Sequence, residues 1–275
     1  MLITWADHLV TRLWARQRQA CYSFTMRIPH LVSCLLLPPA ALVAAAVFPT
    51  PSAAQTQTFA LDSLQGLKLV NVKAEAVTYK GRKAIRIVGT QTRAQGARPT
   101  GAGRPPAGAR RPGGGPALAV VEGADFQDGV IQIDLAGKPA AGAPEAARGF
   151  IGVAFRVAPD ISKYECFYLR PTNARADDQL RRNHSVQYIS FPGWEWFRLR
   201  KETPGKYESY VDLVPGEWTK VKIEVRGDKA RLYVHDAPQP CLIVNDLKQG
   251  VTRGAVALWN GVGTEGYFSN LRISK

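Results

Sequence analysis

Short strand-like segments follow one another from Ala117 to the C-terminus, and they constrain the fold of this chain more than any other feature. Apolar and polar residues alternate within most of them, as in half-buried β-strands. Turn signals such as "PGEW", "RGDKA" and "WNGVGTEG" separate them about every ten residues, and no stretch keeps a helical period. The pattern predicts an all-β, antiparallel sandwich or barrel. The segments are "ALAVVEG", "GVIQIDLAG", "GFIGVAFRVAP", "KYECFYLRP", "HSVQYISFPG", "KYESYVDL", "EWTKVKIEVRG", "KARLYVHD", "PCLIVNDL", "GAVALWNG" and "GYFSNLRIS".

A β-hairpin is predicted upstream of this series. The segments "LKLVNVKAEAVTY" and "KAIRIVG" both alternate, and the dipeptide "KG" between them is a turn signal. A complete sandwich needs this hairpin as well as the C-terminal strands. We therefore expect residues 55–275 to form a single domain of two stacked sheets.

One segment inside this domain is low in complexity. Residues 91–116, "QTRAQGARPTGAGRPPAGARRPGGGP", contain no large apolar side chain. Such a segment cannot bury enough surface to offset its chain entropy, so we predict a disordered loop inserted between two strands. Its arginines are suited to an anionic polymer; the alternative is a solvated insertion with no partner.

The first 54 residues are predicted to be an N-terminal extension and signal peptide. After Met26 and Arg27 comes the apolar run "LVSCLLLPPAALVAAAVF", followed by "PTPSAAQ" with small residues before a cleavage point. This layout predicts a secreted or periplasmic protein with no membrane attachment after cleavage. An uncleaved anchor, or a lipoprotein box at "LVSC", is the alternative.

The formal net charge of +14 is compatible with polyanionic partners. However, the chain has no zinc-finger spacing, helix-turn-helix pattern or aromatic RNA-binding motif, so specific nucleic-acid binding is not predicted. Outside the leader the cysteines are Cys166 and Cys241. They could pair in an oxidising compartment or remain thiols on separate strands, and their spacing does not decide between the two.

The C-terminal strands resemble the closing strands of a concanavalin A-like jelly roll. The resemblance lies in "GEWTKVKIEVRGDKARLYVHD", "LIVNDLKQGVTRGAVALWNG" and "GYFSNLRI", an ending shared by laminin G-like modules and 3-keto-disaccharide hydrolase-like domains. The earlier "GFIGVAFRV" and "YECFYLRP" are similar to a strand pair of the hydrolase-like domains. The resemblance implies a jelly roll over residues 57–275, apart from the low-complexity loop. It also implies a concave face that commonly meets carbohydrate.

In the hydrolase-like relatives an arginine and a glutamate of this strand pair project into the concave face. The matching residues here are Arg156 and Glu165, and Phe167 stands where the relatives usually have a glutamine. If Glu165 lies beside Arg156 on the concave side, then Tyr164, Cys166 and Tyr168 point inward. The alternative places the tyrosines and Arg170 outward and buries Glu165, which is costly without a partner. We expect the first arrangement.

Residues 170–200 are the richest in side chains suited to sugars. Aromatic rings cover the apolar faces of pyranoses, and Arg, Asn, Gln and carboxylate groups bond the hydroxyls. In this segment "PGWEWF" is expected to be extended, with both tryptophans on one side. Trp218 and Trp259 are expected to pack in the core or at its rim. The predicted ligand-binding residues are Arg156, Glu165, Arg170, Asn183, His184, Gln187, Tyr188, Trp194 and Trp196.

No catalytic motif or cofactor site stands out. The chain lacks G-x-S-x-G, H-E-x-x-H, a phosphate-binding glycine loop and the E-x-D-x-x-E arrangement of jelly-roll glucanases. If the chain is an enzyme, Glu165 is the expected acid or base, with Arg156 orienting it. Asp177 and Asp178 are a possible calcium pair without a liganding loop, and no other cofactor is predicted.

Three functions remain open from the sequence. The first is an exported carbohydrate-binding or carbohydrate-associated domain, the second a glycoside-processing hydrolase of the 3-keto-disaccharide type. The third is a laminin G-like adhesion or scaffold module that binds protein or an anionic polymer.

We predict that replacing residues 91–116 by a short glycine linker leaves the melting temperature within a few degrees of the parent chain, because the segment offers no apolar surface to bury. Thermal unfolding followed by circular dichroism measures this. A loss of cooperative folding would show that the segment is structural.

Overall fold

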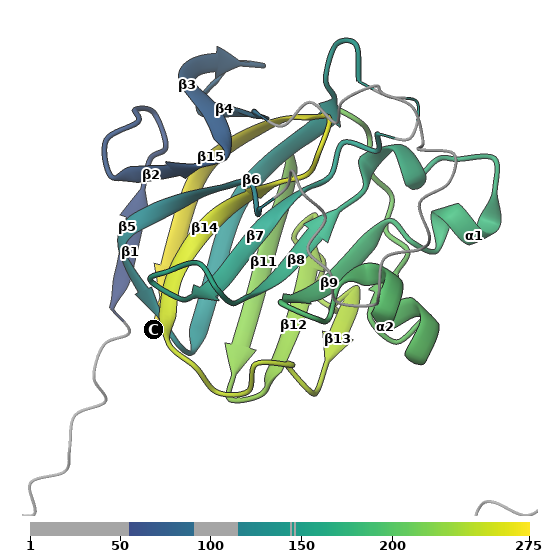
Figure 1. Cartoon of the computed structure of the whole chain (residues 1–275). Helices are drawn as coiled ribbons and strands as arrows, with labels where there is room; N and C mark the ends of the chain where they lie inside the picture. The colour runs from purple at the N-terminus through teal and green to yellow at the C-terminus, as the bar shows by residue number, and fades with distance from the viewer. Residues whose placement is uncertain (1–54, 91–114, 144, 146) are drawn as a thin grey trace, which may run out of the picture. The chain divides into compact units, whose positions relative to one another are not determined.

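The strand pairings build two antiparallel sheets that stack as a sandwich (Figure 1). The computed structural model describes residues 55–90, 115–143, 145 and 147–275, all within one compact unit, Ser52–Lys275. The predicted leader and nearly all of the predicted loop at 91–116 lie outside the described residues. The all-β sandwich predicted from the alternating segments is confirmed.

Both sheets take strands from distant parts of the sequence. Sheet A has eight strands, in the order β13 (Leu242–Val244), β12 (Lys229–Val234), β11 (Thr219–Arg226), β6 (Gly129–Pro139), β15 (Thr264–Ser274), β4 (Arg82–Gly89) and β3 (Val72–Tyr79), with β1 (Thr56–Phe59) also pairing β15. Sheet B has seven, in the order β10 (Glu208–Ser209), β9 (Val186–Phe191), β8 (Tyr164–Leu169), β7 (Ile151–Val157), β14 (Gly254–Asn260), β5 (Leu118–Phe126) and β2 (Leu67–Val70).

The pairings of the two ends of the domain follow the sequence closely. β3 and β4 form the predicted hairpin around Lys80 and Gly81, and the last strand, β15, pairs antiparallel with the first, β1. The short helices η1 (Pro171–Asn173), α1 (Gln179–Arg182) and α2 (Trp196–Glu202) lie in the segments that flank β9. The expected extended form of "PGWEWF" is wrong, because α2 begins at Trp196. A helix of seven residues is too short to display a hydrophobic period in the sequence.

The core lies between the sheets and is filled by the apolar half of each alternation. Ile131, Ile133 and Leu135 of β6 face Val153 and Phe155 of β7, and all five side chains are buried. The sheets approach closely where β6 carries a glycine. A Cβ on Gly137 would lie 2.6 Å from Cγ2 of Ile151, so a side chain does not fit there.

Arg156 breaks the alternation of β7. The strand has a β-bulge at this point, since Phe155 and Arg156 together oppose the single residue Val256 of β14. Arg156 has a φ of 53°, in the left-handed region, and its side chain is buried. The predicted position on the outer, concave face is therefore wrong, because the extra residue of the bulge turns the arginine inward.

The Arg156 guanidinium holds three connections of the sandwich together. Its Nε donates to the carbonyl of Gln127 at 2.9 Å, its Nη1 to Gly250 at 2.8 Å and its Nη2 to Gly227 at 2.7 Å. A further bond joins Nη2 to Asp128 Oδ1 at 3.1 Å. These acceptors belong to the connections β5–β6, β11–β12 and β13–β14, two of which cross between the sheets (Figure 1).

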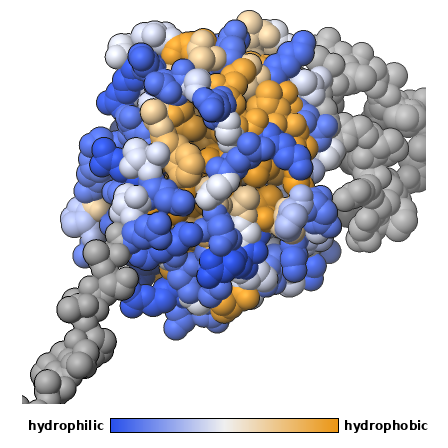
Figure 2. All heavy atoms as spheres, turned by 90° about the vertical axis from the view of Figure 1, so that its left-hand side faces the viewer, coloured by the Kyte–Doolittle hydropathy of each residue, from blue (hydrophilic) through white to orange (hydrophobic). Residues whose placement is uncertain are grey.

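Part of the molecular surface is apolar. Figure 2 looks onto the side where β1, β2 and β3 lie and shows an apolar area surrounded by hydrophilic residues. Leu69 of β2 and Leu64, just before it, are each 40% exposed. Within the part of the chain that the structure describes, no helix is both long enough and apolar enough to cross a membrane.

We predict that Arg156→Met lowers the free energy of unfolding by about 3–5 kcal/mol, because it leaves buried carbonyl oxygens without donors. Methionine keeps the side-chain stem and the same non-glycine backbone. Arg253→Met is the matched control, since Arg253 makes an exposed pair with Asp125 and its loss should cost less than about 1 kcal/mol. Urea unfolding of both variants measures the difference; equal effects would contradict a structural role for Arg156.

Candidate functional site

The outer face of sheet B brings two aromatic rings together over a glycine. Tyr168 of β8 and Trp259 of β14 are both cross-strand partners of Gly152 in β7. Their rings stack with centroids 4.8 Å apart and an interplanar angle of 29°. A Cβ on Gly152 would lie 2.6 Å from the Cβ of Tyr168, so the glycine leaves the space in which the rings meet.

Arg170 lies at the end of β8 among three rings. Its guanidinium carbon is 5.5, 5.1 and 5.9 Å from the ring centroids of Phe150, Tyr168 and Trp196. Its Nη2 donates to Tyr168 Oη at 2.6 Å and to Gln187 Oε1 at 3.0 Å. The residue is only 5% exposed, and its Nε has no hydrogen-bond partner among the described residues. Residues Phe150, Tyr168, Arg170, Trp196 and Trp259 are called the Arg170 cluster below.

A carboxylate lies close by but is already paired with another arginine. Glu208 accepts from Nη2 of Arg200 at 2.6 Å and from its Nε at 3.1 Å, and the side chain is almost fully buried. His184 Nδ1 is 2.9 Å from Glu208 Oε2 but lacks hydrogen-bond geometry. Burial lowers the pKa of His184, and the charges of Arg200 and Arg170 lower it further, against the opposing effect of Glu208. No carboxylate among the described residues pairs with Arg170, which leaves it suited to an anion or a ligand hydroxyl.

The structure brings only some of the predicted ligand residues together. Arg170, Gln187 and Trp196 are in one place, and His184 is beside them through Glu208. Asn183 is exposed at the C-terminus of α1 and is bonded to Gln179. Trp194 does not accompany Trp196: its ring lies under Arg198 and Lys248, at 3.7 and 4.8 Å.

Glu165 and Tyr188 point into the interior, so the expected concave position of Glu165 is wrong. Glu165 is fully buried; Oε2 accepts from Tyr188 Oη at 2.6 Å and Oε1 from the backbone N–H of Gln249 at 2.8 Å. The arrangement with outward tyrosines and a buried carboxyl is the one that forms. Burial disfavours the charged form of the carboxyl. The hydrogen bonds from Tyr188 and Gln249 and the positive charge of Arg156 stabilise that form and so offset the cost of burying it.

Sequence reasoning missed Phe150 and Trp259 as members of the cluster. Trp259 was expected to serve packing alone, although it follows the alternation of β14 to the outer face. Alternation along β8 and β14 would have placed Tyr168 and Trp259 on the same outer face, had the inward side of both strands been assigned correctly. That side was misjudged for β8, and the error removed Tyr168 from the predicted site.

The two cysteines considered for a disulfide and the two aspartates considered for calcium have other roles or remain unpaired in the described structure. Cys166 is buried, Cys241 is partly buried, and both are free thiols. Asp178 caps α1 by accepting from the backbone N–H of Arg181. Within the described ranges no three His, Cys, Asp or Glu side chains are grouped so as to hold a metal ion.

Comparison with known proteins bears on the fold. No family model matches the sequence, and no curated protein matches it. Among solved structures, a protein of unknown function with a galectin-like fold from Bacillus subtilis matches with a TM-score of 0.50 and 10% identity, covering 82% of this chain and 97% of that one. A carbohydrate-binding module, CBM66, from Bacillus subtilis matches with a TM-score of 0.47 and 14% identity, covering 76% and 96%. The predicted concanavalin A-like jelly-roll fold is confirmed.

We predict that the stability advantage of the parent chain over Glu165→Gln shrinks as the pH rises. Burial raises the pKa of the Glu165 carboxyl above its ordinary value. Because the folded-state pKa is raised, the protonated carboxyl makes its full contribution to stability below the unfolded-state pKa of about 4.3. This contribution is lost as the pH rises through the folded-state pKa. The glutamine variant lacks this titration.

Urea unfolding of both proteins at several pH values from 4 to 8 tests this expectation. Taking the difference in unfolding free energy between the two proteins cancels the pH dependence of all titratable groups that they share. A difference that stays constant across this range, or grows with pH, would contradict the buried, charge-disfavouring environment of Glu165.

Proposed function

We propose that the chain is an exported carbohydrate-binding domain whose ligand lies over the outer face of sheet B at the Arg170 cluster. The observation that carries the proposal is the unpartnered Nε of Arg170, a buried donor set among aromatic rings. A buried polar atom without a partner is costly unless water or a ligand satisfies it.

The chemistry of the cluster suits a sugar. Aromatic rings pack against the C–H faces of a pyranose, and a guanidinium donates to hydroxyl or carboxylate oxygens. Gln187 holds the Arg170 guanidinium in place while its own Nε2 donates to the backbone carbonyls of Tyr188 and Tyr207. The arginine is thus fixed before a ligand arrives, which reduces the entropy lost on binding.

Trp196 is the part of the cluster that a ligand reaches first. It is 45% exposed at the start of α2, whereas Tyr168 and Arg170 are 2% and 5% exposed. Trp259 and Phe150 are partly exposed. A ligand that stacks on Trp196 would lie beside the Arg170 guanidinium, whose carbon is 5.9 Å from the centre of that ring.

Binding without turnover is favoured over hydrolysis. The expected catalytic carboxyl, Glu165, lies between the sheets and has no exposed surface for a substrate to reach. Glycosidase chemistry needs two carboxyl groups on either side of one bond. In this cluster the nearby carboxylate, Glu208, is committed to Arg200.

Export is proposed from the sequence, because the basic start, apolar run and small residues of the leader have the layout of a signal peptide. Proteins with this layout act in compartments where extracellular glycans are met. The two parts of the proposal are independent, since the sugar site does not use the leader.

We predict that Trp196→Ala weakens glycan binding about ten-fold or more, because an exposed tryptophan beside an arginine is the typical anchor of such a site. A glycan array with the full chain would identify the ligand, and calorimetry would give the affinities. Phe197→Ala is the matched control, since Phe197 is the next residue of α2, is 58% exposed, meets the Trp196 ring only edge-on at 6.0 Å between centroids and has no arginine contact in the described structure.

Mass spectrometry of each bound glycan after incubation separates binding from turnover. Intact ligand supports the proposal, and cleaved ligand would replace it by hydrolysis. Equal losses in Trp196→Ala and Phe197→Ala, or no loss in either, would contradict the proposed site.

A further inference from the structure

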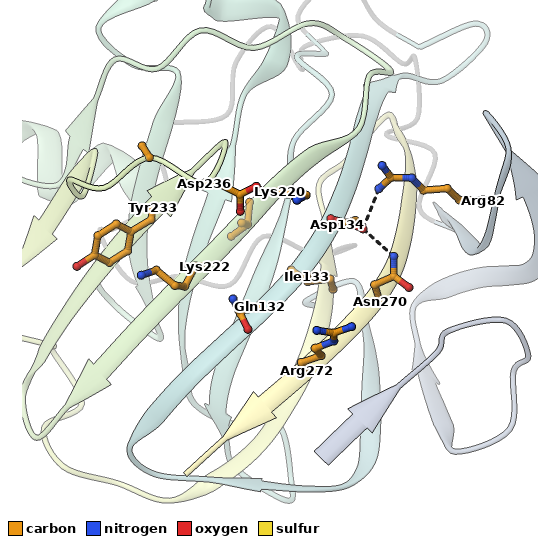
Figure 3. Close-up of a pocket in the computed structure, with 12 residues that line it drawn as sticks. Arg82, Gln132, Ile133, Asp134, Lys220, Lys222, Tyr233, Asp236, Asn270 and Arg272 are labelled. Carbon is orange, nitrogen blue, oxygen red and sulfur yellow. Dashed lines mark hydrogen bonds and ion pairs between the residues drawn. The ribbon is translucent and has the colours of Figure 1, made fainter. Parts of the chain in front are cut away.

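The outer face of sheet A carries a hollow lined mainly by polar and charged side chains, unlike the aromatic Arg170 cluster. Its volume is about 540 Å³, within the range of small-ligand sites, and it opens to solvent over the middle of the sheet (Figure 3). The lining side chains that carry the argument below are Arg82, Gln132, Asp134, Lys220, Lys222 and Arg272.

One row of side chains crosses four strands in the hollow. Tyr233 of β12 pairs Lys222 of β11, which pairs Gln132 of β6, which pairs Arg272 of β15. Figure 3 shows Gln132 between Lys222 and Arg272, as these pairings require. With about 4.8 Å between neighbouring strands, the row is about 14 Å long.

Two groups of this row are free to meet a ligand. Gln132 and Arg272 are both exposed, and within the described part of the chain neither side chain has a hydrogen-bond or ion-pair partner. Arg272 can therefore present its full fork of donors, the arrangement that binds a carboxylate through two parallel hydrogen bonds.

The acidic side chain at the base of the hollow is already neutralised. Asp134 is buried, and its Oδ2 accepts from Nη1 of Arg82 at 2.8 Å and from Nδ2 of Asn270 at 2.7 Å (Figure 3). A bulge in β15 between Ser269 and Arg272 contains Asn270, which has a φ of 55°. Bulges of this kind re-aim side chains and recur beside functional sites.

The lysines of the hollow are held by weak surface pairs. Lys220 bonds Asp236 at 2.7 Å, with both side chains more than half exposed. Lys222 bonds Glu224 at 2.8 Å and lies 3.8 Å from the centre of the Tyr233 ring. Exposed pairs contribute about 0–1 kcal/mol, so a ligand anion can compete for these ammonium groups at little cost.

We infer that this hollow binds an acidic saccharide, with a uronate carboxylate on Arg272 and sugar hydroxyls on Gln132, Asn270 and Asp236. The lysines would complement further carboxylates along the same chain. Two carboxylates line the hollow, Asp134 and Asp236. Asp236 can accept from sugar hydroxyls, whereas Asp134 already accepts from Arg82 and Asn270.

This inference does not depend on the function proposed for sheet B. The hollow and the Arg170 cluster share no residue and lie on the outer faces of different sheets. The two also differ in chemistry, since one sets a buried guanidinium among aromatic rings and the other offers exposed cations and amides. Failure of either leaves the other open to its own test.

The experiment is calorimetric titration of the full chain with a trimer of galacturonic acid, in parallel with a neutral galactose trimer. Arg272→Gln should weaken binding of the acidic trimer about ten-fold or more, the value of a charge-assisted pair of hydrogen bonds. Arg226→Gln is the matched control. It removes the same charge from the same sheet face outside the hollow and should change binding less than about two-fold.

Three results would overturn the inference: equal affinity of the parent chain and Arg272→Gln, equal losses in Arg272→Gln and Arg226→Gln, or equal binding of the acidic and neutral trimers by the Trp196→Ala variant, in which the site proposed on sheet B is weakened. A DNA duplex that competes as well as the acidic trimer would also overturn it, in favour of a general polyanion surface. Unchanged melting temperatures for both variants show that a loss of binding is local. Trp196→Ala should leave the acidic-trimer affinity unchanged, which separates this site from the one on sheet B.

Discussion

The guanidinium of Arg156 is the interaction on which the rest of the sandwich depends. A two-sheet fold is closed at its ends by connections whose backbone carbonyls turn away from either sheet and need donors. Arg156 supplies donors to three of these carbonyls from a fully buried position, and Asp128 balances its charge. The left-handed backbone of Arg156 carries a conformational cost that these bonds offset. The bulge of β7 is thus a structural device that aims one side chain across the end of the sandwich.

Glu165 extends the same arrangement to the β13–β14 connection. Its carboxyl accepts from the backbone of Gln249, while Tyr188 bonds both Glu165 and the backbone N–H of Lys248. Arg156 donates to the carbonyl of Gly250, the next residue. The two interior side chains thus bind neighbouring residues of one connection, Glu165 as an acceptor and Arg156 as a donor. Both side chains use their polar groups for hydrogen bonds inside the fold. Donors without a partner in the described structure lie instead on Arg170 and Arg272, on the outer faces of the two sheets.

The sequence was sufficient for the fold but not for the face on which each candidate residue lies. Alternation and turn signals identify the strands, because both follow from local geometry. A bulge shifts alternation by one residue without any mark in the sequence, so Arg156 was assigned to the wrong face. The error at Glu165 has a different cause. The cost of burying a carboxyl was judged without the donors of Tyr188 and Gln249, which only the tertiary fold brings to it. Trp196 and Arg170 were predicted from their residue types, which suit sugars, and the fold brings the two together.

The two outer faces would respond differently to ionic strength. Stacking on Trp196 and Trp259 is short-ranged and uncharged, and the Arg170 guanidinium beside these rings is buried, so salt should change binding there little. The hollow of sheet A relies on exposed cations, whose attraction is screened over about 8 Å at physiological ionic strength. A ligand that carries both a neutral pyranose and uronates would bind the first face at any salt concentration and the second mainly at low salt. Salt titration therefore distinguishes which face a glycan uses, even before the ligand is identified, because salt screens the exposed cations of sheet A more strongly than the buried guanidinium of Arg170.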